Sequence, residues 1–423
     1  MDSRPEKKTD QDKYLDLQLK MSEKTRGSDL ATALILIVVI FGFAIWGLLL
    51  PDKEKSEQEN RFLQQVPQAS SQYSGTLIQR IKDNKLFDRV LSGDYMEDMT
   101  DYLADQFPMR DMFVEIKAFS EIALGKTENN DVVLASDGWL VDREDYASVD
   151  NVLTNTAAIN LFNGYAKENG IPLTFAVAGK TEDVMLERLP AFYPVSRREE
   201  LWSTLKAGAV DLDYVDLRSI VFENKDESAQ LYYRTDHHWT TLGAYEAYAA
   251  LGEQMGYIPY PLSHFTVETV SDSFYGTIWS SSGMKWVEPD TMEYFRYPGD
   301  MEYTTEIVDT GVTYSGFYDR AFVEQKDKYS SFLSGNNSVV KVRAPEGTED
   351  REKLLILKDS FAHSAVPFLA LHYDIDMLDL RYYNKSTVAS YVSDNGIDRV
   401  LVLCGIESLT DAPTFSVIAA GIN

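Results

Sequence analysis

The stretch KLLILKDSF, residues 353–361, passes abruptly from an apolar run to a polar pair. Its apolar part is short and continuous, which is typical of a strand that is buried on both faces of a sheet. A helical pattern follows from Phe361 to Leu371. The segment therefore predicts a strand, a sharp turn at Asp359 and Ser360, and then a helix, which is the repeating unit of an α/β fold.

The same alternation of apolar runs and helical patterns extends along most of the chain. Strands are expected at 171–179, 210–217, 375–383 and 399–405, and helices at 148–169, 197–209 and 240–255. Residues 264–350 are rich in Tyr, Ser, Gly and Asp, and they are expected to form an irregular insertion over one end of the sheet. The sequence thus predicts an α/β domain with a parallel sheet flanked by helices.

Leu30–Leu50 is a run of 21 residues without a charge. At about 1.5 Å per residue it spans roughly 30 Å, the thickness of the hydrocarbon core of a membrane. No small-x-small cleavage motif precedes Pro51, so an uncleaved transmembrane helix is expected at 30–50. The seven basic residues of the segment 1–29 favour a cytoplasmic tail and an extracytoplasmic main domain.

The remaining boundaries follow from composition. Residues 51–72 are polar and resemble a stalk, and two or three helices are expected between 74 and 124, so that 51–125 precede the main domain at 126–423. Cys404 is the single cysteine and cannot form an internal disulfide.

The chain carries a formal net charge of −27, and the acidic excess lies beyond residue 50. This balance argues against nucleic acid or anionic lipid as the main partner. It is compatible with a neutral or amine-bearing polymer. A solvated acidic surface that keeps the protein soluble explains it equally well.

Ser360 follows a buried strand and precedes a helix, which places it at the carboxyl edge of the sheet, where open α/β folds bind ligands. A serine there exposes its hydroxyl, and its backbone N–H is suited to stabilising an oxyanion. The alternative is that Ser360 only caps the helix.

The motif RTDHHWTTLG, residues 234–243, contains two adjacent histidines beside a carboxylate. If the motif is extended, Asp236 and His238 share one face and His237 points to the other. Asp236 would then orient His238, and His238 would act as a base toward Ser360. This reading requires no metal and no cofactor. Two alternatives stay open, a divalent-metal site built from the three motif residues and plain capping with packing.

The chain resembles the bacterial DHHW family, named for the tetrad that stands here at 236–239, and the SGNH-hydrolase-like domains of bacterial alginate O-acetylation proteins. Those domains carry an Asp-x-His-Trp motif and a later Asp-Ser-Phe. The pieces that carry the resemblance occur in order: SEQENRFL at 56–63, FPMRD at 107–111, DGWL at 137–140, YRTDHHWT at 233–240, FLSGNN at 332–337, LKDSF at 357–361 and DLRYY at 379–383.

The resemblance implies an SGNH-type fold and a triad of Asp236, His238 and Ser360. It departs at Lys358, where SGNH enzymes usually have glycine before the Asp-Ser pair. Further oxyanion donors are expected from the Gly335 N–H and the Asn336 amide, although a Gly-Asn turn is often only a turn.

Three further side chains are candidates for contact with substrate: Arg381, Tyr382 and Trp239. Arg381 fits a structural salt bridge equally well, and Trp239 fits an anchor for its helix. Trp139 is expected in the core rather than as a sugar platform.

The resemblance implies a membrane-anchored O-acetyltransferase that acts on a cell-surface or secreted polysaccharide, with acetyl groups supplied by a membrane-bound O-acyltransferase partner. A carbohydrate acetylesterase would use the same residues, because the two activities differ only in whether a sugar or water accepts the acetyl group. A non-catalytic scaffold of a polysaccharide assembly or export complex is the alternative of a different class.

Overall fold

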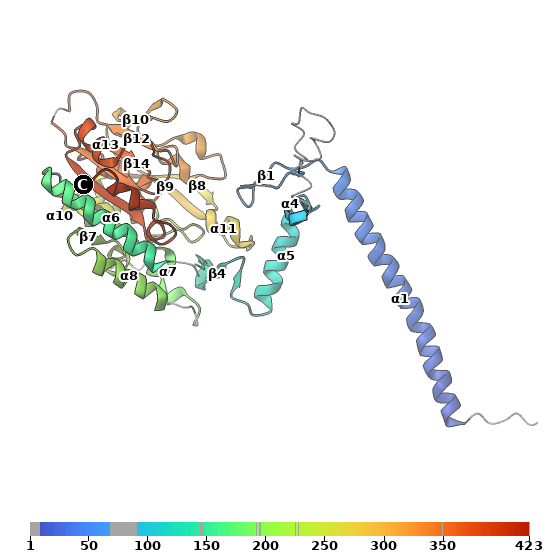
Figure 1. Ribbon diagram of the computed structural model, residues 1–423. Helices are drawn as coiled ribbons and strands as arrows, with labels where there is room; N and C mark the ends of the chain where they lie inside the picture. Colours follow the sequence, from blue (N-terminus) through green and yellow to red (C-terminus); the bar gives the residue numbers. More distant parts are fainter. Residues whose placement is uncertain are drawn as a thin grey trace, which may run out of the picture. The chain divides into compact units, whose positions relative to one another are not determined.

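The computed structural model describes residues 9–67, 91–143, 148–191, 193, 196–224, 226, 228–348 and 350–422. The chain divides into two compact units, the first made of residues 1–56 and 61–113 and the second of residues 57–60 and 114–423. Figure 1 labels their helices and strands along the ribbon.

The first unit begins with helix α1 (Asp10–Leu49), in which Ser28–Leu49 is long and apolar enough to cross a membrane. Strands β1 (Lys55–Ser56) and β2 (Arg61–Phe62) then pair antiparallel, so the segment expected as a plain stalk contains a small hairpin. Helix α4 (Asp94–Asp105) lies in the first unit, and helix α5 (Arg110–Ala123) begins there and continues into the second; both agree with the helices expected after residue 74. The part of that expectation at 74–90 and the stalk residues 68–72 lie outside the described residues.

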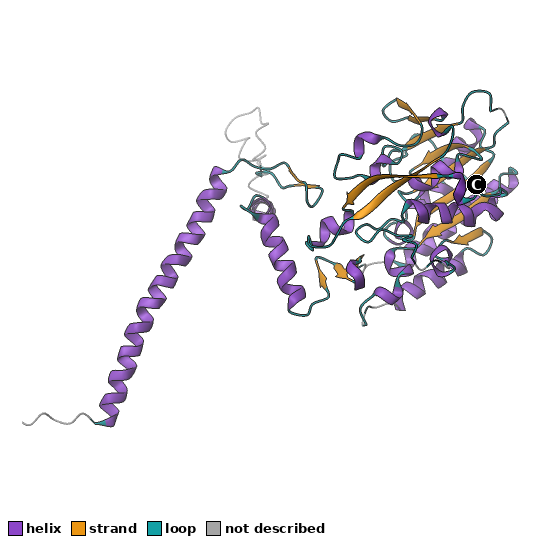
Figure 2. Ribbon diagram, turned by 180° about the vertical axis from the view of Figure 1, so that it is seen from behind, coloured by secondary structure: helices purple, strands orange, loops and turns teal. Residues whose placement is uncertain are grey.

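The second unit is built on an eight-stranded sheet of order β11-β10-β12-β14-β13-β15-β6-β7. The strands are β6 (Leu173–Ala178), β7 (Asp213–Asp216), β10 (Thr304–Ile307), β11 (Val312–Ser315), β12 (Val339–Arg343), β13 (Lys353–Lys358), β14 (Asp374–Leu378) and β15 (Arg399–Gly405). The five strands from β14 to β7 run parallel, as the alternation of strands and helices predicts. Figure 2 shows these strands in orange with purple helices around them.

Helices cover both faces of this sheet, and the strand residues alternate between two hydrophobic cores. One core joins Leu354 and Ile356 of β13 to helices α10 (Thr241–Met255) and α12 (Ala362–Leu369). The other joins Leu355 and Leu357 to α6 (Val149–Glu168), α8 (Ser196–Gly208) and α13 (Val388–Asn395). A strand with apolar side chains toward both cores has no polar face, which explains the continuous apolar run in its sequence.

Local signals place the helix ends. The Ser148 hydroxyl accepts the Asn151 N–H at 3.2 Å before α6, and the Thr240 hydroxyl accepts the Gly243 N–H at 3.1 Å before α10. Helix α10 ends at Gly256, whose φ of 77° lies in the left-handed region.

Shorter elements surround the main sheet. Besides β1 and β2, the described strands outside it are β3 (Glu128–Asn129), β4 (Val132–Leu134), β5 (Leu140–Asp142), β8 (Thr266–Phe274) and β9 (Asp290–Arg296). The short helices are α7 (Thr181–Val184), α9 (Ser219–Phe222), α11 (Thr277–Ser282) and α14 (Glu407–Thr410). Single 3₁₀ turns are η1 (Ser136–Gly138), η2 (Leu186–Arg188), η3 (Leu262–His264), η4 (Asp300–Glu302), η5 (Arg320–Phe322), η6 (Tyr329–Ser331) and η7 (Thr414–Ala419).

Residues 264–350 are more regular than the sequence predicts. Strands β8 and β9 pair antiparallel, and β10, β11 and β12 extend the main sheet by antiparallel pairing beyond β14. Many aromatic residues of this region, among them Tyr294, Phe317 and Phe332, are buried in the core that contains α10. Strands β10 (TTEI) and β11 (VTYS) have only four residues each and are half polar, so the continuous apolar run that identifies the other strands is missing here.

Candidate active site

Ser360 lies in the turn between β13 and α12. The Asp359 carboxylate accepts the N–H groups of Phe361 at 3.0 Å and Gly405 at 2.7 Å and the Ser408 hydroxyl at 2.6 Å. These bonds tie the turn to the end of the neighbouring strand β15. Helix α12 has no side-chain cap, so the structure does not support Ser360 as a helix cap.

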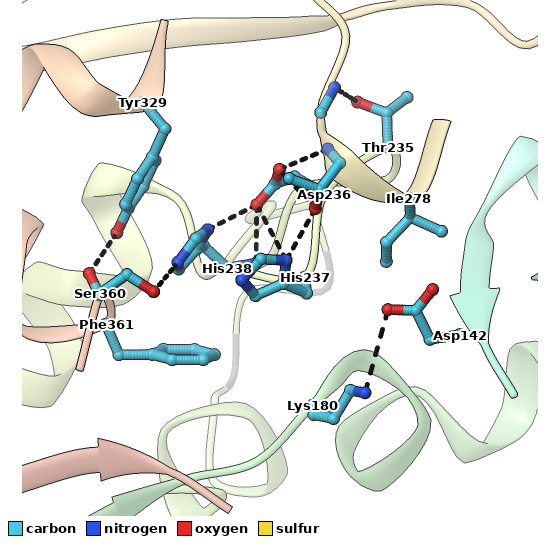
Figure 3. Close-up of polar contacts among 12 residues, drawn as sticks. Asp142, Lys180, Thr235, Asp236, His237, His238, Ile278, Tyr329, Ser360 and Phe361 are labelled. Carbon is cyan, nitrogen blue, oxygen red and sulfur yellow. Dashed lines mark hydrogen bonds and ion pairs between the residues drawn. The ribbon is translucent and has the colours of Figure 1, made fainter. Parts of the chain in front are cut away.

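The Ser360 hydroxyl is the end of a chain of hydrogen bonds that begins at Asp236 (Figure 3). The His238 Nδ1 lies 2.6 Å from Asp236 Oδ1, and the His238 Nε2 lies 2.7 Å from Ser360 Oγ. Because an ionised carboxylate only accepts hydrogen bonds, the proton of a neutral His238 belongs on Nδ1. The Nε2 atom then accepts the serine hydroxyl, which is the geometry a general base requires.

Helix α11 holds the Asp236 carboxylate in place. Asp236 Oδ2 accepts the Thr277 N–H at 2.8 Å and the Thr277 hydroxyl at 3.2 Å. The backbone of Gly276 approaches so closely that a Cβ atom there would lie 2.2 Å from the Asp236 Cβ. A glycine is therefore required at 276 by close approach of two chain segments.

The electrostatic environment keeps the aspartate charged and the histidine neutral. Burial alone would raise the pKa of Asp236, but its electrostatic interactions with His237 and His238 and the hydrogen bonds that it accepts hold that pKa well below its usual range. Burial and the neighbouring His237 lower the pKa of His238, although Asp236 opposes them. At neutral pH, His238 is thus an unprotonated base.

Aromatic rings enclose the His238 imidazole. Tyr329 stacks on it with ring centroids 3.9 Å apart, and the Phe361 ring lies at 5.1 Å. The Tyr329 hydroxyl donates to the Ser360 carbonyl at 3.3 Å (Figure 3). Trp239 is fully buried, does not line the pocket, and donates from Nε1 to the Ser364 hydroxyl at 2.9 Å. It therefore anchors the base of the site and does not contact the pocket.

The expectation for His237 was wrong in one respect. Residues 234–238 bend, so the two imidazoles lie side by side with centroids 3.9 Å apart, and both line the pocket. His237 Nδ1 bonds the Thr277 hydroxyl at 2.7 Å, and its side chain is 22% exposed against 6% for His238. Only His238 contacts Ser360.

The bend also brings three potential metal ligands together. Asp236, His237 and His238 offer one ligand atom each, all within 4.8 Å of one another. However, both ring nitrogens of His238 are engaged, one with Asp236 and one with Ser360. A metal bound by His238 would have to replace one of these two hydrogen bonds.

A pocket of about 510 Å³ opens in front of Ser360. Gly335, Asn336 and Arg381 line it as expected, whereas Tyr382 does not and is 53% exposed. The Gly335 N–H donates to the Phe332 carbonyl at 3.2 Å, so Gly335 forms a turn and offers no oxyanion donor.

Arg381 lines the pocket and also forms the salt bridge that the sequence left open. It binds the Asp379 carboxylate through Nε at 2.8 Å and Nη2 at 2.6 Å, and Nη2 also lies 3.4 Å from Asn336 Oδ1. Asn336 lines the same pocket, so its NH₂ group remains a candidate oxyanion donor.

Lys358 replaces the glycine of the SGNH pattern without entering the pocket. Its ammonium lies 2.8 Å from His363 Nε2 and 3.0 Å from Asp379 Oδ2, and the side chain is completely buried. The sequence feature that could have predicted this network is a lysine at the end of an apolar strand. No sequence signal pointed to Tyr329, Thr277 or Glu407, which line the pocket.

Two family models match the chain. The DHHW protein model matches residues 217–377, and the model described as SGNH hydrolase-like domain, acetyltransferase AlgX, matches residues 132–292. The two matches overlap on the segment that contains Asp236 and His238.

Individual proteins show the same similarity. A probable alginate O-acetylase AlgJ of Pseudomonas aeruginosa is 25% identical over 155 residues, which cover 36% of this chain and 39% of that protein. The chain therefore spans about two fifths of the length of this curated relative.

Two solved structures share the fold. A DHHW family protein of Eubacterium siraeum has a TM-score of 0.56 at 23% identity, covering 68% of this chain and 97% of that one. Bacillus cereus PatB1, solved with a sulfonyl adduct, has a TM-score of 0.56 at 21% identity, covering 67% and 98%. Residues 132–377 of this chain thus carry the DHHW and SGNH hydrolase-like signatures on a shared, mostly parallel α/β fold.

Proposed function

We propose that this chain is a membrane-anchored, extracytoplasmic O-acetyltransferase that modifies a cell-surface or secreted polysaccharide. The observation that carries the proposal is the hydrogen-bonded series from Asp236 through His238 to Ser360 at the pocket. The names of the similar proteins, a probable alginate O-acetylase and an acetyltransferase domain, support the reaction class.

In the first half-reaction, His238 Nε2 takes the hydroxyl proton as Ser360 Oγ attacks the acetyl carbonyl of the donor. The negative charge of the tetrahedral intermediate is met by the Ser360 N–H and the Asn336 amide, and Asp236 stabilises the imidazolium. Collapse breaks the bond to the leaving group, which receives the proton from His238. The product is acetyl-Ser360.

In the second half-reaction, His238 takes a proton from a sugar hydroxyl, and the sugar oxygen attacks the acetyl-serine carbonyl. Collapse breaks the ester to Ser360, whose oxygen regains the proton from His238. If water takes the place of the sugar, the same residues perform deacetylation, and the pocket in front of Ser360 is open to both. The esterase is therefore the second candidate function.

The topology belongs to the proposal as well. Helix α1 anchors the chain, the segment 1–29 stays in the cytoplasm, and a membrane-bound O-acyltransferase delivers acetyl groups to the outer face. Protease added to intact cells should remove the second unit. Its survival until the cells are lysed would contradict this orientation.

The test of the reaction uses the full-length chain in detergent with p-nitrophenyl acetate, with and without an oligosaccharide, and follows acetate release and sugar mass. Transfer predicts a sugar heavier by one acetyl group; an esterase predicts acetate alone. A sulfonyl fluoride should label Ser360 in peptide mapping and not Ser330, which lies in the same pocket against Asp327.

Replacement of Ser360 by Ala should abolish both labelling and turnover. Its stability should stay within about 1 kcal/mol of the native chain, because the hydroxyl caps no helix. Full turnover in this variant would end the nucleophile assignment, whereas a native chain without labelling and without turnover would favour the non-catalytic scaffold.

A further inference from the structure

The charges that line the pocket restrict the acceptor, and we infer that its sugar chain carries no negative charge. This inference rests on the proposed function. Among the described residues that line the pocket, acidic side chains outside the triad and the Ser360 turn come from two stretches of the chain, Asp327 from one and Glu407 with Asp411 from the other. Arg381 is the only lysine or arginine in that lining.

Arg381 adds no excess positive charge at this place. Its guanidinium binds Asp379 through two nitrogens, and Lys358 binds the same carboxylate from below. The Asp359 carboxyl lies close enough to both cations to influence their pKa values. Two cations thus face two buried carboxyls.

Lys180 neutralises Glu407 only in part. The ammonium of Lys180 lies 3.8 Å from Glu407 Oε2, but it also lies 3.8 Å from Glu182 Oε1 and 3.9 Å from Asp142 Oδ2 (Figure 3 shows the contact with Asp142). Lys180 is therefore shared by three carboxyls, of which Glu182 also lies 3.6 Å from the guanidinium of Arg198. Burial would raise the pKa of Glu407, but Lys180 and the two histidines hold it below its usual range, so Glu407 is ionised at neutral pH.

A sugar carboxylate at Ser360 would therefore enter a pocket of like charge. The lining carboxylates belong to the same pocket as the nucleophile, so their repulsion acts within the screening length of physiological salt. The net charge of −27 has the same sign at longer range. An acceptor without carboxylates avoids this cost, which is a means of discrimination against polyuronates such as alginate.

The experiment compares two acceptors of equal length, an N-acetylglucosamine oligomer and a mannuronate oligomer, with the full-length chain and p-nitrophenyl acetate as donor. Transfer to the uronate should be at least about tenfold slower at low salt, and added salt should narrow the difference. Equal or faster transfer to the uronate would overturn the inference.

Variants test the cause. Glu407→Gln and Asp327→Asn should each raise the ratio of uronate to neutral transfer about threefold. The ratio cancels any loss that is common to both acceptors. The control is Asp394→Asn, an exposed carboxylate on α13 that does not line the pocket and should leave the ratio unchanged. An unchanged ratio in both pocket variants would also overturn the inference.

The outcomes separate the two proposals. A chain that forms acetyl-Ser360 but prefers the uronate contradicts only the acceptor class. A chain that forms no acetyl-Ser360, or that passes the acetyl group to water alone, contradicts the transferase function and this inference with it.

Discussion

Two buried polar networks meet at the turn that carries Ser360, and each contains a histidine that accepts a hydrogen bond at Nε2. In the first, His238 Nε2 lies 2.7 Å from the Ser360 hydroxyl. In the second, His363 Nε2 lies 2.8 Å from the Lys358 ammonium. Both histidines line the pocket, and burial lowers the pKa of both.

The networks differ in what the histidine can do with its partner. The Ser360 hydroxyl is half-buried and can become a nucleophile when His238 takes its proton. Lys358 is completely buried and is held by Asp379, so it remains a fixed donor. A histidine beside polar groups is thus insufficient to identify an active site. The group that the histidine contacts through Nε2 decides whether it can act as a catalytic base. Changes in the first network should reduce activity, and changes in the second should reduce stability.

The largest expected effect separates the two adjacent histidines. His238→Ala removes the base and should lower kcat/KM for an activated acetyl ester by about 10⁴-fold or more. His237→Ala is the matched control, and it should cost far less because His237 does not contact Ser360. Equal losses in both variants, together with loss of activity on chelation and recovery with added zinc or manganese, would favour the metal reading.

The second expected effect concerns the buried network of Lys358, His363 and Asp379. Lys358→Met leaves Asp379 with one cation and His363 without its donor, and it should lower the free energy of unfolding by about 3 kcal/mol. Lys353→Met, at the exposed start of the same strand, should change it by less than about 0.5 kcal/mol. Denaturant unfolding measures both. If the Lys358 variant is as stable as the native chain but inactive, the network around Lys358 contributes to the reaction and not to stability.

The third effect tests how closely the first network is positioned. The backbone of Gly276 has a φ of −77°, which alanine adopts without strain, so Gly276→Ala acts only through the clash with Asp236. A displacement of this carboxylate should reduce turnover about 10²-fold. Gly164→Ala is the control, since a Cβ there meets nothing within 4 Å. Native turnover in Gly276→Ala would show that the position of Asp236 is not critical.

The smallest effect is a displacement of the pH profile. Because burial and His237 lower the pKa of His238 below 6.5, the acidic limb of kcat/KM should have its midpoint below pH 6.5. Because the pKa of His238 is lower in the folded chain, the unfolded chain binds a proton at this residue at a higher pH than the folded chain does. Stability should therefore also decrease as the pH falls below about 6.5. A turnover series from about pH 4 to pH 8 measures the limb. A midpoint above 6.5 would contradict a buried neutral base.

The sequence by itself determined the elements and the candidate residues. The apolar run of β13 predicted a strand buried on both faces, and Asp236, His238 and Ser360 were selected before their distances were known. Such patterns are local: burial on both faces removes polar side chains from a strand, and a turn into a helix exposes the residue that follows the strand.

Only the tertiary structure decided how distant segments meet. The bend that places His237 beside His238, the antiparallel strands β10–β12 and the stacking of Tyr329 on His238 had no local signature. His238 and Ser360 are separated by 122 positions, and their contact depends on Gly276 admitting Asp236 and on Asp359 tying its turn to β15. These are contacts between segments far apart in the chain, which the periodicity of a single segment does not encode.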